Sequence, residues 1–218
     1  MGMKKQRNNK LQNSTKVRGR GRPRAFDADV AVTAAERTFL RQGYSATTID
    51  DLSLAMGINR PSLYAAFEGK EALYQRALQV YADRMGALFA DALKERTLPK
   101  ALRRLYSVAL DAYVSQDGDA VGCMVACTAV TEAVSNAAVK EQTKSVMDDI
   151  DDLVARRIEK AIDDGDLPGT VNAKALSRLA VGVLHTLAMR SRAGTSRRVL
   201  DQMATDAVAM LTQSMSCR

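Results

Sequence analysis

The chain has 218 residues, of which 46 % are hydrophobic and 26 % are charged, a composition typical of a soluble globular protein with a sizeable core. No apolar run approaches the roughly 18 residues of a membrane span, and the basic N-terminus lacks the apolar segment of a signal peptide. We therefore predict a cytoplasmic protein with no membrane partner. The three cysteines, Cys123, Cys127 and Cys217, are an odd number and argue against a disulfide framework.

The net charge of +7 is concentrated at the N-terminus. Residues 1–24 carry nine lysines and arginines and no acid, which leaves 23 basic against 25 acidic residues in the rest of the chain. A segment so rich in Asn, Gly and Lys cannot bury enough surface to fold alone, so we predict a basic disordered tail over residues 1–24. Two interpretations stay open for it: a solubilising extension, or an arm that lies along DNA phosphates or enters a minor groove.

The first helix is predicted from residue 27 or 28 to residue 41. Asp27 is a suitable N-cap, and Gly43 ends the helix. Tyr44 follows the stop and is expected to close a small core. One face of the helix is expected to pack against the next two helices, and its residues at helical spacing are Val30, Ala34, Ala35, Thr38 and Phe39.

Residues 48–67 predict a helix, a tight turn and a second helix. Thr48 and Asp51 form a capping-box pattern at the start of the first helix, and Gly57 can take the left-handed conformation of a C-cap. Pro61 suits the first turn of the second helix, where its missing N–H costs nothing. Because Arg60 precedes a proline, we expect extended backbone there, with its side chain ahead of the helix.

The second helix of this pair has two distinct faces. Leu63, Ala66 and Phe67 are expected to be buried, which leaves Arg60, Ser62, Tyr64 and Ala65 on the outer side. A basic, small and hydroxyl-rich face suits a DNA major groove. The alternative is an ordinary pair of amphipathic helices without a ligand.

The remaining chain predicts helices only. They are expected at residues 71–94, 99–115, 122–136, 137–163, 173–192 and 196–214, with a loop at 116–119. Lys70 opposes the dipole of the helix that follows it, and a bound phosphate would explain its position. We predict an all-α fold with a three-helix helix-turn-helix domain at residues 25–70 and a helical domain at residues 71–218.

Thirteen residues between 39 and 73 carry a resemblance to a known family. These residues are Phe39, Gly43, Tyr44, Thr47, Thr48, Ala55, Gly57, Leu63, Tyr64, Phe67, Lys70, Glu71 and Leu73. With their spacing, residues 25–75 closely resemble the N-terminal domain of TetR-family transcriptional regulators, the TetR/AcrR type. Residues 122–136, which begin Gly-Cys, resemble a helix of the family's ligand domains more weakly.

The resemblance implies a homodimeric repressor that a small-molecule effector releases from a palindromic operator in double-stranded DNA. By matching position, Arg60, Pro61, Ser62 and Ala65 would approach bases, while Thr48, Tyr64 and Lys70 would contact phosphates. The last two helices would form the dimer through Leu179, Val183, Leu187, Met189, Val199, Met203, Val208, Met210 and Leu211. Candidate ligand-pocket residues, which offer adaptable apolar surface with a few polar groups, are Tyr106, Leu110, Tyr113, Met124, Thr128 and Met147.

Other functions are less well supported by the sequence. Asp148, Asp149, Asp151 and Asp152 resemble a terpenoid-synthase metal motif, but no second motif lies on a facing helix, so a solvated acidic face is the better account. His185, the only histidine, is expected to be packed. We therefore predict no catalytic residues, metal or cofactor. A thiol sensor at Cys123 and Cys127 stays open beside plain core packing, and so does a sequence-independent DNA-coating protein driven by the tail.

Overall fold

The computed structural model describes residues 26–114 and 118–213, and the predicted tail and Cys217 lie outside these ranges. The described residues contain helices and one isolated bridge, between Val114 and Ala120, which confirms the all-α prediction. The elements are α1 (Ala28–Gln42), α2 (Ile49–Met56), α3 (Arg60–Phe67), α4 (Lys70–Ala92), α5 (Leu98–Ala112), the π-helix η1 (Val125–Ala129), α6 (Val130–Glu132), α7 (Ala137–Asp163), α8 (Ala173–Arg192) and α9 (Arg197–Gln213).

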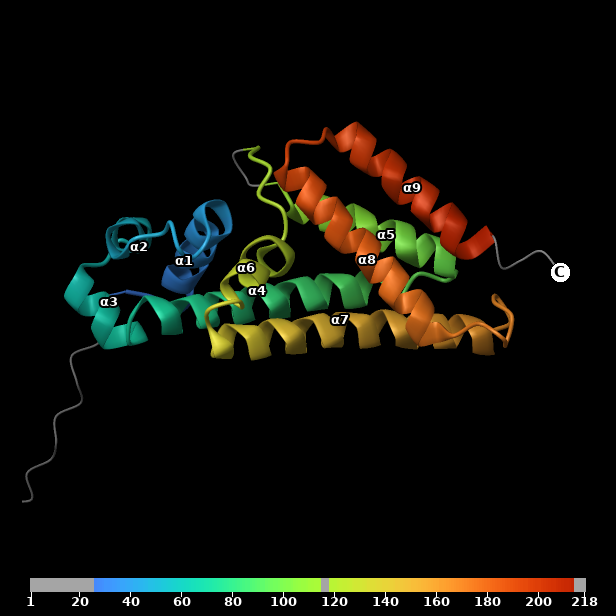
Figure 1. Ribbon diagram of the computed structural model, residues 1–218, viewed down its shortest axis with the longest axis horizontal. Helices are drawn as coiled ribbons and strands as arrows, with labels where there is room; N and C mark the ends of the chain where they lie inside the picture. The colour runs from blue at the N-terminus through green and yellow to red at the C-terminus, as the bar shows by residue number, and fades with distance from the viewer. Residues whose placement is uncertain (1–25, 115–117, 214–218) are drawn as a thin grey trace, which may run out of the picture.

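Helix α4 joins the two parts of the molecule. At one end α1, α2 and α3 form a small three-helix unit, called the reading head below, while α5 and α7–α9 form the larger part (Figure 1). Helix α4 contacts α1 and α3 near its start and α5 and α7 further along. The predicted boundary between residues 70 and 71 falls in the first turn of α4, so one rigid helix belongs to both parts.

Aromatic side chains close the reading head against α4. The ring of Tyr74, on α4, lies 5.0 Å from the ring of Phe39 and 5.1 Å from the ring of Tyr44, both in edge-on contact. Edge-to-face aromatic pairs at such distances stabilise the fold by more than the burial of their apolar area alone would. Tyr44 packs against the core, as expected from its place after the end of α1.

The buried face of α1 differs from the predicted one. Ala35 and Phe39 are buried as expected, but Val30 is 67 % exposed and Glu36 is only 3 % exposed. The other buried residues are Ala31, Val32 and Leu40. Since α1 packs against both α2 and α4, its buried face is wider than one stripe and is rotated away from Val30.

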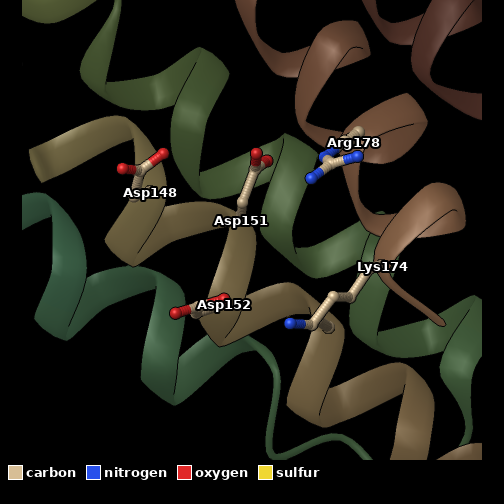
Figure 2. Close-up of a pocket in the computed structure, with 6 residues that line it drawn as sticks. Asp148, Asp151, Asp152, Lys174 and Arg178 are labelled. Atoms are coloured by element: carbon tan, nitrogen blue, oxygen red, sulfur yellow. The ribbon is translucent and has the colours of Figure 1, made fainter. Parts of the chain in front are cut away.

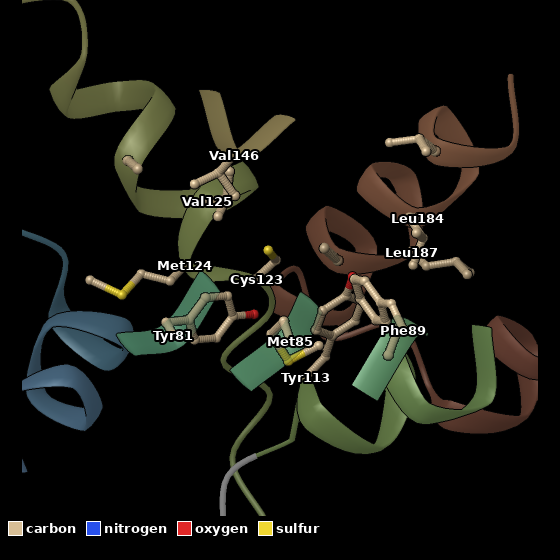
Figure 3. Close-up of a cluster of buried hydrophobic side chains, with 14 of the residues drawn as sticks. Tyr81, Met85, Phe89, Tyr113, Cys123, Met124, Val125, Val146, Leu184 and Leu187 are labelled. Carbon is tan, nitrogen blue, oxygen red and sulfur yellow. The ribbon is translucent and has the colours of Figure 1, made fainter. Parts of the chain in front are cut away.

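The core of the larger part is continuous around α4. Tyr81, Met85 and Phe89 of α4 pack among side chains from the segment after α5 and from α8 (Figure 3). Cys123 lies in this cluster, and burial raises the pKa of its thiol, so Cys123 is a small apolar core residue. Cys127 is only half-buried, and burial raises its thiol pKa as well.

The helix that we predicted at residues 122–136 is shorter in the structure: η1 continues directly into α6, and the helical run ends at Glu132. Gly122 has a φ of +69°, and a Cβ there would lie 2.8 Å from the carbonyl oxygen of Ala188 and 2.9 Å from the sulfur of Cys127. The chain turns at this glycine before η1 and the short α6 begin. By contrast, the predicted bounds of α7 and α8 are confirmed.

None of the helices within the two described ranges is both long enough and apolar enough to cross a membrane.

Candidate nucleic-acid interface

The capping box of α2 is formed as predicted. The backbone N–H of Asp51 donates to the Thr48 hydroxyl (3.1 Å), and the Thr48 N–H donates to the Asp51 carboxylate (2.8 Å). The Thr48 hydroxyl itself donates to the same carboxylate (2.6 Å), and this hydrogen bond holds the pKa of Asp51 below its usual value. Gly57, with a φ of +64°, ends the helix in the left-handed conformation.

Asn59 sets the start of α3, and sequence reasoning missed it. Its side-chain oxygen accepts the N–H of Ser62 (2.9 Å), and its own backbone is extended. Arg60 is consequently the first residue of the helix, so the prediction that Arg60 is extended was wrong. The steric effect of Pro61 on the preceding residue is a bias, and the N-cap at Asn59 overrides it. The sequence did contain a signal for this cap, because an asparagine directly before a helix with a proline in its first turn is a typical N-cap.

We expect the Asn59→Ala variant to destabilise the start of α3. Loss of an N-cap side chain leaves helix N–H groups without a partner and costs about 1 kcal/mol. Urea unfolding of the full chain measures this cost, and Asn59→Ser, which retains a capping oxygen, is the matched control. Equal stability of the alanine and serine variants would contradict the capping role.

The outer face of α3 carries the predicted base-contacting residues. Leu63 and Phe67 are buried, as predicted, whereas Pro61, Tyr64 and Ala65 are exposed. Ser62 is half-buried, and Ala66 packs against the core. The four predicted base-contacting residues, Arg60, Pro61, Ser62 and Ala65, thus lie within two turns of one helix.

Arg60 contacts a carboxylate that sequence reasoning did not connect with it. The Nε of Arg60 donates to Oδ1 of Asp50 (2.6 Å), and its Nη2 pairs with Oδ2 of the same side chain. Their side chains are 61 % and 65 % exposed. This bond holds the pKa of Asp50 below its usual value and raises the pKa of Arg60. The signal in the sequence was only an acid in the first turn of α2.

The N-terminus of α4 lies beside α3. Gly69 precedes the helix and offers no side-chain cap, so the first N–H groups of α4 lack a side-chain acceptor. A Cβ at Gly69 would lie 3.7 Å from the Tyr64 ring, which shows how closely α3 approaches. The ammonium of Lys70 lies 4.2 Å from the centre of the Tyr44 ring. Burial lowers the pKa of Lys70, and Glu132 opposes this shift.

The predicted pocket residues lie in or beside the core of the larger part. Tyr106, Leu110, Tyr113 and Met124 are buried, and Met147 is half-buried. The Tyr106 hydroxyl donates to a backbone carbonyl of α8 (3.0 Å), and burial raises its pKa. Thr128 also lines a cavity.

That cavity of about 240 Å³ lies between the reading head and the larger part. Tyr44 lines it from the reading head, and Cys127, Thr128, Glu132 and Arg192 line it from the other side. The Thr128 hydroxyl donates to the carbonyl of residue 124 (2.7 Å) and lies 3.1 Å from the hydroxyl oxygen of Tyr74. Through these contacts, the cavity borders the aromatic cluster that closes the reading head.

Arg192 connects the end of α8 directly to the reading head. Its Nη1 donates to the carbonyls of Leu40 and Val121 (both 2.7 Å), and its Nη2 donates to the carbonyl of Arg41 (3.1 Å). The last carbonyls of a helix lack partners within it, and a cation there also interacts favourably with the negative end of the helix dipole. The end of α1 is therefore held by a side chain of α8.

The acidic segment of α7 forms a surface groove with compensating charge. Asp148, Asp151 and Asp152 line a cavity of about 230 Å³ together with Lys174 and Arg178 of α8 (Figure 2). Burial raises the pKa of Asp151, and Arg178 opposes the shift. Across the described ranges, no group of three or more acidic, histidine or cysteine side chains is placed to hold a metal ion.

His185 is packed near this groove, as the sequence analysis expected. The side chain is half-buried, and burial lowers its pKa, an effect that Asp151 opposes.

Helices α8 and α9 leave apolar side chains on the surface. Leu179, Met189, Val199 and Met210 are exposed, although all four are large hydrophobic residues. Two of the residues predicted for the dimer contact, Leu187 and Val208, are instead buried within the chain's own core. Helical spacing correctly identified Leu187 and Val208 as residues of apolar faces. Spacing alone does not show whether such a face packs in the chain's own core or against a second copy of the chain.

Comparisons with known proteins agree with this arrangement. Residues 31–77 match the family described as "Bacterial regulatory proteins, tetR family", and residues 99–207 match "Tetracyclin repressor-like, C-terminal domain". The HTH-type transcriptional repressor ComR of Escherichia coli (strain K12) is 28 % identical over 193 residues, covering 86 % of this chain and 90 % of ComR. The repressor BdcR of the same organism is 38 % identical over 106 residues, 48 % of this chain and 53 % of BdcR.

A solved structure is also similar over most of its length. The TetR family transcriptional regulator CifR, in a cysteine-substituted form complexed with a 26 bp double-strand operator DNA, has a TM-score of 0.79 and 29 % identity. The match covers 86 % of this chain and 98 % of that chain. With both family matches, the helix-turn-helix geometry and this shared fold, the chain belongs to the TetR family of transcriptional regulators.

Proposed function

We propose that the chain is a homodimeric repressor that binds a palindromic operator in double-stranded DNA and is released by a small molecule. The observation that carries the proposal is the exposed face of α3, which presents an arginine, a hydroxyl and a methyl group within two turns. The relatives ComR and BdcR are repressors by name, and CifR is a regulator complexed with operator DNA. A regulator that acts on DNA would work in the cytoplasm, which is where we propose that this protein is located.

The base contacts follow from the chemistry of this face. Arg60 suits a guanine, because a guanidinium can donate two parallel hydrogen bonds to O6 and N7. Ser62 can donate to or accept from a base edge, and the methyl group of Ala65 can contact a thymine methyl. Pro61 lies beside them in the first turn.

The phosphate contacts surround this face. Tyr64 and the uncapped N-terminus of α4 lie together, and helix N–H groups bind phosphate oxygens well. Lys70 would add a positive charge at that point by moving its ammonium away from the Tyr44 ring, against which it packs. Thr48 would reach a phosphate only by giving up the hydrogen bond that its hydroxyl donates to Asp51, so we expect it to contribute least.

We expect the Lys70→Ala variant to bind every DNA sequence more weakly. Loss of one phosphate contact reduces the slope of log affinity against log salt concentration by about one. Fluorescence anisotropy on operator and non-operator duplexes across a salt series measures this slope. An unchanged slope would remove Lys70 from the contact, and Lys100→Ala, an exposed lysine on α5, is the control for charge alone.

The dimer contact is proposed to involve the exposed apolar residues of α8 and α9. Leu179, Val199 and Met210 are large hydrophobic side chains on the surface, and a second copy related by two-fold symmetry would cover them. Two reading heads in such a dimer read half-sites about 34–36 Å apart.

The effector is proposed to bind among the middle helices, at Tyr106, Leu110, Tyr113, Met124, Thr128 and Met147. Thr128 supports this placement, because it borders a cavity and contacts Tyr74, which packs on the reading head. A ligand that moves Thr128 would change the packing behind α1. To induce release, the ligand must bind more tightly to the dimer state whose heads do not match the operator.

The test is selection of bound sequences from a random duplex library at about 0.15 M salt, where non-specific attraction is screened. The same selection is made with a variant that lacks residues 2–24. Recovery of one palindrome by both proteins supports a specific repressor. Recovery of nothing above background, together with loss of all binding on deletion of the tail, would favour the alternative, a sequence-independent DNA-coating protein.

A further inference from the structure

We infer that Asp50 is a positioning residue for base recognition: its carboxylate holds the Nε–Nη2 edge of the Arg60 guanidinium and so presents the terminal Nη1–Nη2 edge to a guanine. The inference rests on the proposed function, in which Arg60 contacts a base. It adds that base recognition by α3 depends on Asp50, a residue of α2 that is not part of the exposed face of α3. It also predicts that this acid, placed on a DNA-binding surface, lowers affinity while raising specificity.

The hydrogen-bond geometry leaves the correct donors available. A guanidinium has five N–H groups, and the Asp50 carboxylate takes one from Nε and one from Nη2. The Nη1 group and the second Nη2 proton remain, and together they form the terminal fork of the side chain. That fork can donate two parallel hydrogen bonds to O6 and N7 of guanine. Asp50 therefore occupies the side of Arg60 that base reading does not need.

Fold stability gives little reason for this ion pair. Both side chains are more than half exposed, and exposed ion pairs contribute little to stability. The capping carboxylate of α2 is Asp51, which already accepts the hydrogen bonds at the start of that helix. An acid next to the DNA would also repel phosphates, so its presence opposes binding unless it serves another purpose.

Restricting Arg60 supplies that purpose. A long arginine side chain on a surface has many rotamers, and without a partner it can turn to a phosphate as readily as to a base. The bidentate pair fixes the guanidinium plane before DNA arrives, so less conformational entropy is lost on binding the correct base. Its negative charge simultaneously disfavours a move of Arg60 toward the backbone. Both effects increase the difference in affinity between the correct base and the other bases.

The test is the Asp50→Asn variant of the full chain, which keeps the size of the side chain and removes its charge. We expect discrimination at the guanine that Arg60 contacts to fall about threefold to tenfold. A complete bidentate contact with a base contributes a discrimination of roughly 5-fold to 150-fold, so the expected change is only part of it. Affinity for non-operator DNA is expected to rise. Discrimination is measured as the ratio of dissociation constants for the operator and for duplexes substituted at that one base pair.

Two controls isolate the role of Asp50. Asp29→Asn removes the same charge from another exposed acid of the reading head, one that pairs with Arg76 rather than Arg60. It is expected to raise affinity without changing discrimination. In the Arg60→Ala background, Asp50→Asn is expected to leave discrimination at that base pair unchanged, because Asp50 acts only through Arg60; the two changes together form a double-mutant cycle. Thermal unfolding of each variant checks that α2 and α3 remain folded.

The outcomes separate this inference from the proposed function. If Arg60→Ala loses preference at one base pair and Asp50→Asn does not, the positioning role is wrong and the repressor proposal stands. If Asp50→Asn and Asp29→Asn change affinity and discrimination alike, Asp50 acts through charge alone, which also overturns the inference. If no variant, nor the unaltered chain, prefers any sequence, the proposed function itself is wrong.

Discussion

The Arg60→Ala variant is expected to bind the selected operator about 5-fold to 150-fold more weakly than the unaltered chain, with the loss confined to the correct base at one position of each half-site. Arg60 is the first residue of α3, is more than half exposed, and keeps the terminal fork of its guanidinium available while Asp50 holds the other edge. Alanine removes that fork. Operators that already carry a different base there are expected to lose little affinity.

Competition binding against single-substitution operator variants measures this effect. Arg37→Ala is the matched control, because it removes an exposed arginine from α1 without touching α3. It is expected to leave the base preferences unchanged. A uniform loss for Arg60→Ala on every duplex, with all preferences retained, would identify Arg60 as a phosphate contact and transfer base reading to Ser62 and Ala65.

Local signals in the sequence were sufficient for much of the fold and of the helix-turn-helix. The capping box at Thr48 and the glycine at position 57 act within a few residues, so they fix the ends of α2 regardless of what packs on it. The bounds of α7 and α8 were also predicted correctly, and in the structure Asn136 and Asn172 cap the starts of these helices.

Features that depend on contacts distant in sequence could not be predicted. Periodicity indicates that α1 has an apolar face, but α2 and α4 together decide where its centre lies, which is why Val30 is exposed. The pairing of Arg60 with Asp50 links residues ten apart across a turn. The contacts of Arg192 with the end of α1 link residues more than 150 apart. Apart from the acid in the first turn of α2, charge and spacing in the sequence carry no signal for either contact.

The burial of Glu36 is the clearest case of such a distant contact. This acid lies on the buried face of α1, only 3 % exposed, and its carboxylate pairs with Arg84 on α4. Burial raises the pKa of Glu36, and Arg84 opposes that shift. The sequence placed Glu36 beside apolar positions without indicating that a cation 48 residues later would neutralise it. The pair thereby connects the reading head to the helix that joins both parts.

We expect the Arg84→Ala variant to lower the free energy of unfolding at pH 7.5 by about 1–3 kcal/mol. Removing one partner of a buried pair costs roughly 3–5 kcal/mol, because the other charge stays buried without compensation. The expected loss is smaller here, since the Arg84 side chain is half exposed and water screens the pair. Urea unfolding of the full chain gives the difference from the unaltered chain.

The loss is expected to depend on pH in a defined direction. Without Arg84, the folded-state pKa of Glu36 rises further above its unfolded value. In the window between the two pKa values, the folded state binds more protons than the unfolded state, so stability falls as pH rises. The difference between Arg84→Ala and the unaltered chain should therefore be largest at pH 7.5 and smaller near pH 5, where the carboxyl can be protonated in the folded state.

A second substitution distinguishes charge from packing. Arg84 also lies over the ring of Tyr81, with its guanidinium carbon 5.4 Å from the ring centre, so alanine removes a packing contact too. Adding Glu36→Gln to Arg84→Ala removes the buried charge, keeps the size of the side chain, and should restore most of the stability lost at pH 7.5. A loss that is equal at both pH values and unaffected by Glu36→Gln would mean that Arg84 stabilises the fold through its contact with Tyr81 on α4, rather than through the ion pair with Glu36 of α1.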